Sequence, residues 1–598
     1  MTDTRRARVR APELRGRGWL NTDGRSFEVG DFRGRYLLLD FWTFCCVNCL
    51  HVLDELRPLE EKYDGELVVV GVHSPKFVHE ADPDALAAAV ERYEVAHPVL
   101  DDPELVTWQA YTARAWPTLV LVDPEGYVLA QYAGEGHVHA IDALVAGTRK
   151  RYRERGVLQP GTSPYVPPPV EAGDLRFPAK AVRLPDGGFL VADSGHHSLV
   201  ELADDAETLV RRIGSGERGL VDGDAGTARF SEPNGLCLLP PDLAATVGYD
   251  VVVADTVNHA LRGVRLDDGH VRTLAGDGRQ LFPGPQPSDS LSSPWDVAWW
   301  KERVWVAMAG LHQLWTFDPL SGSVGVAAGT TNEGLLDGPL AGAWFAQTSG
   351  LAADGDRLWL ADSETSSLRR VEDGQVLTTV GTGLFDFGFR DGPAADALLQ
   401  HPLGVTVLPD GSVAVCDTYN GAVRRVAGDE VTTLATGLAE PSGAVVDGDT
   451  LVVVESAAHR LTRVPLAGVA TADGFEHRTH RPVTDVAAEV ELVVEFQPPP
   501  GQKVDDRFGP PSQLVVSATP PALLREGEGR TTELRRRLVL DPSVGDGVLH
   551  VAARAASCDE GGGEGAACHL HQQDWGVPVR VTRSGEAVLA LPLSGRSD

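Results

Sequence analysis

Three of the chain's seven cysteines fall within five residues, at Cys45, Cys46 and Cys49. Two residues separate Cys46 from Cys49. This is the spacing of a redox pair in which one thiolate attacks a disulfide and the second thiol resolves the mixed disulfide. A zinc site would need a second pair of ligands with similar spacing. The first quarter of the sequence holds no second such pair, although His51 and His73 lie there. The spacing therefore favours thiol–disulfide exchange over a metal site or inert core cysteines.

The elements around these cysteines alternate between strands and helices. Strands are expected at residues 36–42, 67–72, 118–122 and 127–132, and helices at residues 50–63, 82–93, 103–111 and 140–151. The strands are short apolar runs, and the first helix repeats leucine at helical spacing. This alternation indicates an α/β domain with a central sheet. It puts Cys46 at a strand-to-helix junction, where free backbone N–H groups and the helix dipole favour a thiolate.

Two segments carry a family resemblance. The run DFWTFCCVNC at residues 40–49 resembles the active-site strand and turn of thioredoxin-fold proteins, and Trp116-Pro117-Thr118 resembles the cis-proline loop of the same fold. The resemblance covers roughly residues 10–150. It implies that Cys46 is the nucleophile and that Cys49 is the resolving thiol.

The resemblance also assigns roles to residues beside the cysteines. It implies that Asp40 is the buried acid that takes the resolving thiol's proton, and that Pro117 holds substrate backbone beside the sulfurs. The site departs from the pattern in two places. Cys45 replaces the tryptophan usual before the first cysteine, and Val47-Asn48 replaces the common Gly-Pro or Pro-Pro. Cys45 is therefore either a third redox thiol or a small buried residue.

A repeat of short strands follows a Pro- and Gly-rich linker at residues 156–172. Six segments share a strand that usually ends in an acidic residue, with a hydrophobic residue six positions later. They contain Ala192-Asp193, Ala254-Asp255, Ala307-Met308, Ala361-Asp362, Cys416-Asp417 and Val454-Glu455. A repeat of this length, built of short strands, predicts a six-bladed all-β propeller at residues 173–470.

The repeats themselves carry a second resemblance. Residues 255–262 and 417–425 resemble the blade signatures of NHL repeats. A thioredoxin-like domain with a CCxNC motif, then NHL repeats, then a β-rich tail is similar to the family of NHL-repeat-containing protein 2. The resemblance implies the architecture and leaves the substrate open.

Other residues recur at fixed blade positions. The acidic residues are expected to hydrogen-bond to turns, and Cys237 and Cys416 are read as small buried residues. The histidines are expected to cap turns within their own blades, with a metal-binding ring around the channel as the alternative. These histidines are His197, His259, His312 and His459.

The C-terminal region, residues 478–598, is predicted to be a separate small all-β sandwich. Cys558 and Cys568 flank a Gly- and Glu-rich loop there, and His569 and His571 follow at once. Three alternatives stay open for the two cysteines: a local disulfide that could exchange with the N-terminal pair, a zinc site, or two free thiols.

The net charge and the N-terminal sequence limit the classes of partner and the location that we expect. The formal net charge of −32 argues against nucleic acid or an anionic membrane as a partner, because both require basic surfaces. The arginine-rich start lacks a following apolar run, so we expect no secretory signal, no membrane span and a cytoplasmic location. We expect no bound cofactor and no metal.

The whole chain is thus predicted to be multidomain. Its α/β thioredoxin-like fold spans residues 1–155, before the propeller and the sandwich. The predicted function is a thiol–disulfide oxidoreductase of the reductase or isomerase type. It would act on a protein or small-molecule disulfide, draw on a thiol electron donor, and recruit a protein partner on the propeller face. The alternative is a non-catalytic interaction scaffold in which the thioredoxin-like domain is a docking module.

Overall fold

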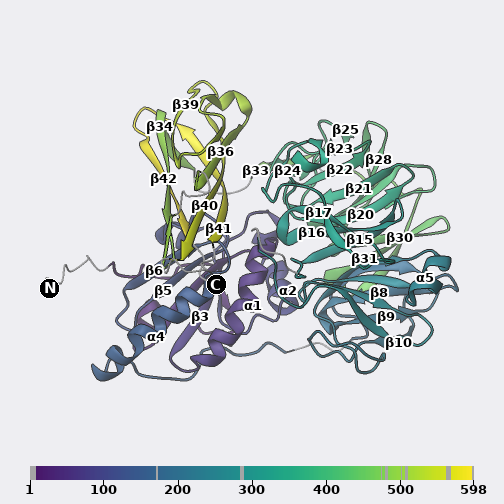
Figure 1. Cartoon of the computed structure of the whole chain (residues 1–598), viewed down its shortest axis with the longest axis horizontal. Helices are drawn as coiled ribbons and strands as arrows, with labels where there is room; N and C mark the ends of the chain where they lie inside the picture. The colour runs from purple at the N-terminus through teal and green to yellow at the C-terminus, as the bar shows by residue number, and fades with distance from the viewer. Residues whose placement is uncertain are drawn as a thin grey trace. The chain divides into compact units, whose positions relative to one another are not determined.

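The structure is a computed structural model. It describes residues 9–169, 173–282, 289–384, 386–472, 474–478, 483–499, 501–504, 510–559 and 568–594. The chain forms two compact units (Figure 1). One comprises Met1–Val170 with His480–Asp598, and the other Glu171–Phe282 with Gln286–Thr479. None of the helices in the described part of the chain is long and apolar enough to cross a membrane.

The N-terminal domain is a thioredoxin-like α/β fold. Its described residues form a six-stranded sheet in the order β1-β4-β3-β2-β5-β6. The strands are β1 (Gly18–Leu20), β2 (Tyr36–Trp42), β3 (Leu67–His73), β4 (Val99–Asp101), β5 (Thr118–Val122) and β6 (Val128–Ala133). The helices are α1 (Val47–Lys62), α2 (Pro83–Arg92), α3 (Val106–Ala110) and α4 (Val138–Glu154). The alternation expected from the sequence is therefore present.

The central strands β2 and β3 are parallel and buried along their whole length. This explains why both read as continuous apolar runs, since a strand covered on both faces has no polar side. Helices α1 and α4 cover one face, where Leu56, Ile141 and Val145 pack against Leu38 and other residues of the sheet. Helix α1 begins three residues before the leucine pattern predicts, so the helix itself starts inside the cysteine motif.

The second unit is a six-bladed β-propeller, as the repeat predicts. Its described strands form six successive antiparallel blade sheets, drawn from blue-teal to green in Figure 1, and one two-stranded sheet of β24 (Asp386–Phe389) and β33 (Phe475–Arg478). The blades are β7–β10 (Pro178–Ile213), β11–β14 (Pro233–Ala275), β15–β18 (Pro294–Ala328), β20–β23 with β19 (Gly338–Val380), β26–β29 with β25 (Gly392–Ala435) and β30–β32 (Pro441–Pro465). In each blade the first strand, such as β7 or β11, is the innermost.

The acidic residue that ends the second strand of most blades has a structural role. Asp255 accepts a backbone hydrogen bond from Ser231 at 2.8 Å and binds Nη1 of the fully buried Arg262 at 2.8 Å. Arg262 also donates to Asp222, the aspartate of an Asp-Gly loop. The fourth and fifth blades repeat this arrangement with Asp362–Arg369–Asp337 and Asp417–Arg424–Asp391. The acidic residues thus hydrogen-bond to turns, as expected.

The prediction that each histidine caps a turn in its own blade was wrong. Each ring accepts a backbone N–H from the next blade. The pairs are His197 with Glu232, His259 with Ser293 and His312 with Gln347. All three histidines have left-handed backbone; His197 and His312 each end a short 3-10 helix, and His259 ends a turn.

One of these contacts closes the ring of blades. His459 in the last blade accepts the N–H of Phe177, next to the first blade, at 2.9 Å. Ser442 donates to the carbonyl of Ala179 at 2.5 Å beside it. All four strands of the first blade come from consecutive residues, so these side-chain bonds join the last blade to the first without an exchanged strand.

The C-terminal domain is β-rich, as predicted. Its strands are β34 (Thr484–Gln497), β35 (Gln502–Val504), β36 (Ser512–Thr519), β37 (Leu524–Glu526), β38 (Gly529–Thr531), β39 (Arg535–Leu540), β40 (Asp546–Asp559), β41 (Cys568–Val581) and β42 (Glu586–Ser594). Hydrogen bonds join these described strands into one network around a single core that includes Val490, Leu514 and Leu549.

Candidate thiol–disulfide site

The cysteine motif lies at the turn between β2 and α1. Cys46 is the N-cap residue of α1, with extended backbone (φ −91°, ψ 110°). Its carbonyl oxygen accepts the N–H groups of Cys49 at 2.9 Å and Leu50 at 3.2 Å. No side-chain hydrogen bond from Cys46 caps this helix start, and Cys46 lies at the N-terminal end of the helix dipole. The helix start therefore favours an anion where the sequence places the nucleophile.

The two thiols of the motif interact directly. Cys49 is fully buried, and a side-chain hydrogen bond links it to Cys46, which is 6% exposed. Both are free thiols in this structure. Burial raises the pKa of the Cys49 thiol well above its ordinary value, the hydrogen bond with Cys46 adds to this, and Lys76 acts in the opposite direction. The arrangement keeps the inner thiol protonated and in contact with the outer one.

Asp40 lies in β2 below the cysteines and is fully buried. Among the described residues, neither of its carboxylate oxygens has a hydrogen-bond partner. Burial raises the pKa of Asp40 well above its ordinary value, and the charges of Glu60 and Glu55 raise it further. Because burial raises its proton affinity, the ionised form of such a carboxyl can take a proton from a neighbouring thiol.

The proline loop lies at the same end of the sheet as the cysteines. The Trp116–Pro117 bond is cis. Thr118, which follows it, pairs with Phe41 in the antiparallel β2–β5 ladder, so Pro117 sits beside the end of β2. The carbonyl of Pro117 accepts the N–H of Gly134 at 2.8 Å, and this bond fixes the loop against the residues after β6.

Sequence reasoning missed one residue of this site, Glu80. Its carboxylate is fully buried next to the cysteine turn. It accepts hydrogen bonds from the Thr43 hydroxyl at 2.6 Å and the Cys45 N–H at 2.9 Å. It also accepts the backbone N–H groups of Lys76 at 2.9 Å and Phe77 at 3.0 Å. No local pattern marks Glu80, because its partners come from two different loops.

The remaining candidate residues have structural surroundings. Cys45 is not disulfide-bonded and is 2% exposed, and its backbone N–H donates to Glu80. His51 Nδ1 lies 2.6 Å from Oε2 of the buried Glu135. His73 stacks on Phe44, and burial lowers the pKa of His73 to about 3. Within the described residues of this unit, no three His, Cys, Asp or Glu side chains lie close enough together to hold a metal ion.

The C-terminal cysteines lie opposite each other in the β40–β41 hairpin, where Cys558 and Cys568 are register partners. Cys558 is buried and disulfide-bonded. The side chain of Cys568 and the loop at residues 560–567 fall outside the described residues, as does the side chain of His569. The Cys558–Cys568 pairing therefore remains a prediction that the strand register favours. His571 hydrogen-bonds to Ser557 at 2.7 Å.

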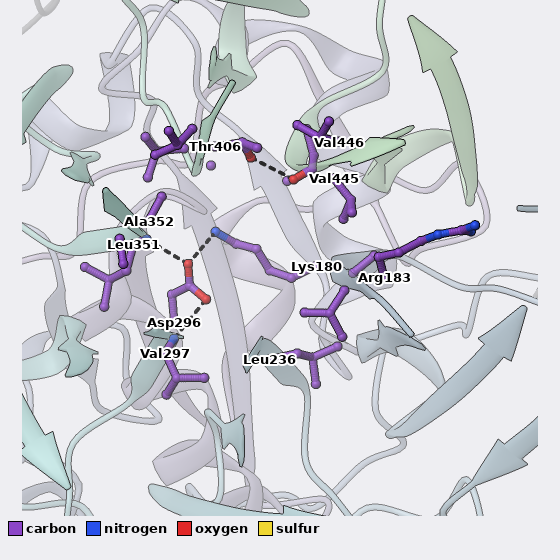
Figure 2. A pocket seen from close by; sticks show the side chains of 18 of the residues that line it. Lys180, Arg183, Leu236, Asp296, Val297, Leu351, Ala352, Thr406, Val445 and Val446 are labelled. Carbon is purple, nitrogen blue, oxygen red and sulfur yellow. Dashed lines mark hydrogen bonds and ion pairs between the residues drawn. The ribbon is translucent and has the colours of Figure 1, made fainter. Parts of the chain in front are cut away.

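A cavity of about 380 Å³ occupies the propeller channel (Figure 2). The innermost strands of all six blades line it. At its floor, Lys180 Nζ lies 3.1 Å from Asp296 Oδ2 and also donates to the carbonyls of Ser349 and Leu403. The three N–H groups of Lys180 are therefore all used inside the protein.

Comparisons with known proteins bear on both units. A family model described as thioredoxin-like matches residues 34–128, and the NHL repeat model matches residues 399–425. NHL repeat-containing protein 2 of Gallus gallus is 35% identical over 470 residues, which span 71% of this chain and 63% of the relative. Over that span the chain is similar to NHL repeat-containing protein 2. The architecture inferred from the motifs is thereby confirmed.

Two further relatives frame the function. Protein SUPPRESSOR OF QUENCHING 1, chloroplastic, of Arabidopsis thaliana is 38% identical over 445 residues, covering 70% of this chain and 41% of that protein. Thiol-disulfide oxidoreductase YkuV of Bacillus subtilis is 25% identical over 136 residues, covering 22% of this chain and 90% of that protein. The chain spans less than two thirds of the length of both NHL repeat-containing protein 2 and SUPPRESSOR OF QUENCHING 1. Because one relative is named as chloroplastic, the cytoplasmic location remains a prediction.

Proposed function

We propose that the N-terminal domain is a thiol–disulfide oxidoreductase of the reductase or isomerase type. One observation carries the proposal. Cys46 is the N-cap residue of α1, and its thiol interacts with that of the buried Cys49. A thiol at a helix start with a second, fully buried thiol beside it is the arrangement that two-step thiol exchange requires. The name of YkuV, a relative over this domain alone, is consistent with this activity.

The proposed reaction proceeds in two steps. The Cys46 thiolate attacks one sulfur of a substrate disulfide, so a bond forms between Cys46 and that sulfur while the other substrate sulfur leaves as a thiolate. Cys49 then loses its proton and attacks Cys46. This closes the Cys46–Cys49 disulfide and releases the second substrate thiol. Two electrons pass to the substrate, and a dithiol or thiol donor must restore the reduced pair.

Asp40 and Pro117 support these steps. The Cys49 thiol has a raised pKa, so it needs an acceptor for its proton, and the charge of Asp40 is among the groups that act on it. We assign the proton-accepting role to Asp40. Pro117, which lies beside the end of β2, would hold the backbone of a protein substrate. The propeller face would recruit that protein or another partner.

The test is turnover of a small-molecule disulfide, such as glutathione disulfide, with dithiothreitol as the electron donor. The wild type should turn over, and Cys46→Ser should lose the activity at least 100-fold because no other described thiol caps a helix. Cys416→Ser, which changes a buried propeller cysteine, is the matched control and should match the wild type. A wild type with no turnover, or equal rates for Cys46→Ser, would leave the scaffold alternative.

A further inference from the structure

The loop after β3 connects the two halves of the cysteine site. At one end, the Ser74 N–H donates to the carbonyl of Trp42 at 2.9 Å, and the Ser74 carbonyl accepts Nε1 of Trp116 at 2.7 Å. At the other end, Glu80 binds the turn that carries Thr43 and Cys45. Residues 74–80 are therefore bonded both to the cysteine turn and to the residue before Pro117.

The Glu80 carboxylate is the centre of this connection. Its Oε1 takes two donors from the cysteine turn, and its Oε2 takes two backbone N–H groups from the loop itself. All four donors lie in a region shielded from water, because Glu80 is fully buried. Hydrogen bonds to a charged acceptor are roughly twice as strong as neutral ones, so this single side chain holds two loops in one geometry.

We propose that Glu80 is a positioning residue for the redox pair. It fixes the backbone of Cys45 and thereby the start of α1, so that the Cys46 sulfur stays in reach of Cys49. Glu80 does not touch the substrate or exchange a proton. This inference rests on the proposed function, since it concerns the stability of the Cys46–Cys49 disulfide.

A glutamine at this position cannot replace the carboxylate. One end of an amide is an NH₂ group, which would face either the donors of the cysteine turn or the two N–H groups of the loop. With the NH₂ toward the cysteine turn, the Thr43 hydroxyl can turn to accept it, but the Cys45 N–H is left buried without its acceptor. With the NH₂ toward the loop, the N–H groups of Lys76 and Phe77 both lose their acceptor. In either orientation Glu80→Gln weakens the connection between the two loops, and the turn would relax away from its present position.

The measurement is the equilibrium between the Cys46 and Cys49 thiols and glutathione disulfide in the full-length protein. Glu80→Gln should lower the constant for forming the Cys46–Cys49 disulfide at least tenfold, which is about 30 mV for two electrons. The matched control is Asp123→Asn. Asp123 is also buried and accepts the N–H groups of Glu125 and Tyr127 in a turn away from the cysteines. It should destabilise the fold and leave the constant within twofold.

A second variant separates geometry from charge and covers a Glu80→Gln protein that does not fold. Thr43→Val removes one donor to Glu80 and keeps the carboxylate, so only the positioning changes. We expect it to lower the disulfide constant about threefold. A constant equal to the wild type in Thr43→Val, or in folded Glu80→Gln, overturns the inference. If the wild type forms no Cys46–Cys49 disulfide at any glutathione ratio, the proposed function fails and the inference fails with it.

Discussion

Lys180 and Asp296 meet across the propeller channel, with Nζ 3.1 Å from Oδ2. They occupy equivalent positions of the first and third blades, two residues after a proline. The other four blades have glycine there, at Gly235, Gly350, Gly404 and Gly443. These glycines are closely approached, and a Cβ on Gly235 would lie 2.4 Å from the Cα of Asp296. The ion pair thus lies at a level of the channel where the other four blades have no side chain.

Removing one charge of this pair should lower the free energy of unfolding strongly, whereas removing both charges should lower it less. Lys180→Met leaves the buried Asp296 without its cation, and we expect a loss of about 3–5 kcal/mol in the free energy of unfolding. The double variant Lys180→Met with Asp296→Asn removes both charges, keeps an oxygen that can accept the Leu351 N–H, and should recover part of that loss. Urea unfolding of the single and double variants measures both. A single variant as stable as the wild type would contradict this expectation.

The propeller should open most readily between its first and last blades, which the contact between His459 and Phe177 joins. It joins blades that are far apart in sequence, whereas His259 joins blades that the chain also connects directly. His459→Ala should cost about 1–3 kcal/mol, the penalty for a buried N–H left without an acceptor. His259→Ala removes the same bond elsewhere and is the control. Hydrogen exchange should rise in β7–β10 and β30–β32 for His459→Ala, and a pattern identical to that of His259→Ala would contradict the ring-closing role.

Asp40 should make the fold less stable as the pH rises. Burial raises the pKa of Asp40, whereas an unfolded aspartate titrates near 3.9. Between these two values the folded state holds one more proton than the unfolded state, so the free energy of unfolding falls with increasing pH. Asp40→Asn has no such proton. Its stability relative to the wild type should increase from pH 4 upward, by about 1.4 kcal/mol per pH unit until the folded pKa is passed.

Asp541 provides the control of opposite sign. Hydrogen bonds from Ser543 lower the pKa of Asp541 to about 2, so its contribution is present above the unfolded value and is lost only as the pH falls through the folded value. Asp541→Asn should therefore differ from the wild type by a constant amount between pH 5 and 8. If Asp40→Asn behaves in the same way, Asp40 is already ionised in the folded protein.

The parts of the site that sequence predicts are the local ones. Cys46 at a strand-to-helix junction follows from the apolar run before it and the leucine spacing after it. The cis-proline loop follows from Trp116-Pro117 by resemblance. The blades follow from the recurrence of segments such as Asp255 to Leu261, because each blade is one local unit.

The parts that sequence does not predict depend on neighbours distant in the chain. Glu80 acts because two loops meet at its carboxylate, and nothing in its own segment indicates this. His459 reaches the first blade only after all six have closed into a ring. Lys180 and Asp296 are 116 positions apart. Each stands where the other four blades have glycine, and this equivalence becomes visible only when the blades are superimposed.

The most direct test of the central claim is the mass of Cys49→Ser after reaction with glutathione disulfide. Without its resolving thiol, the protein should retain one glutathione on Cys46, and peptide mapping should locate it there. Cys46→Ser should retain none. An adduct on Cys45 instead, or no adduct on Cys49→Ser, would contradict the assignment of Cys46 as the attacking thiol and Cys49 as its resolver.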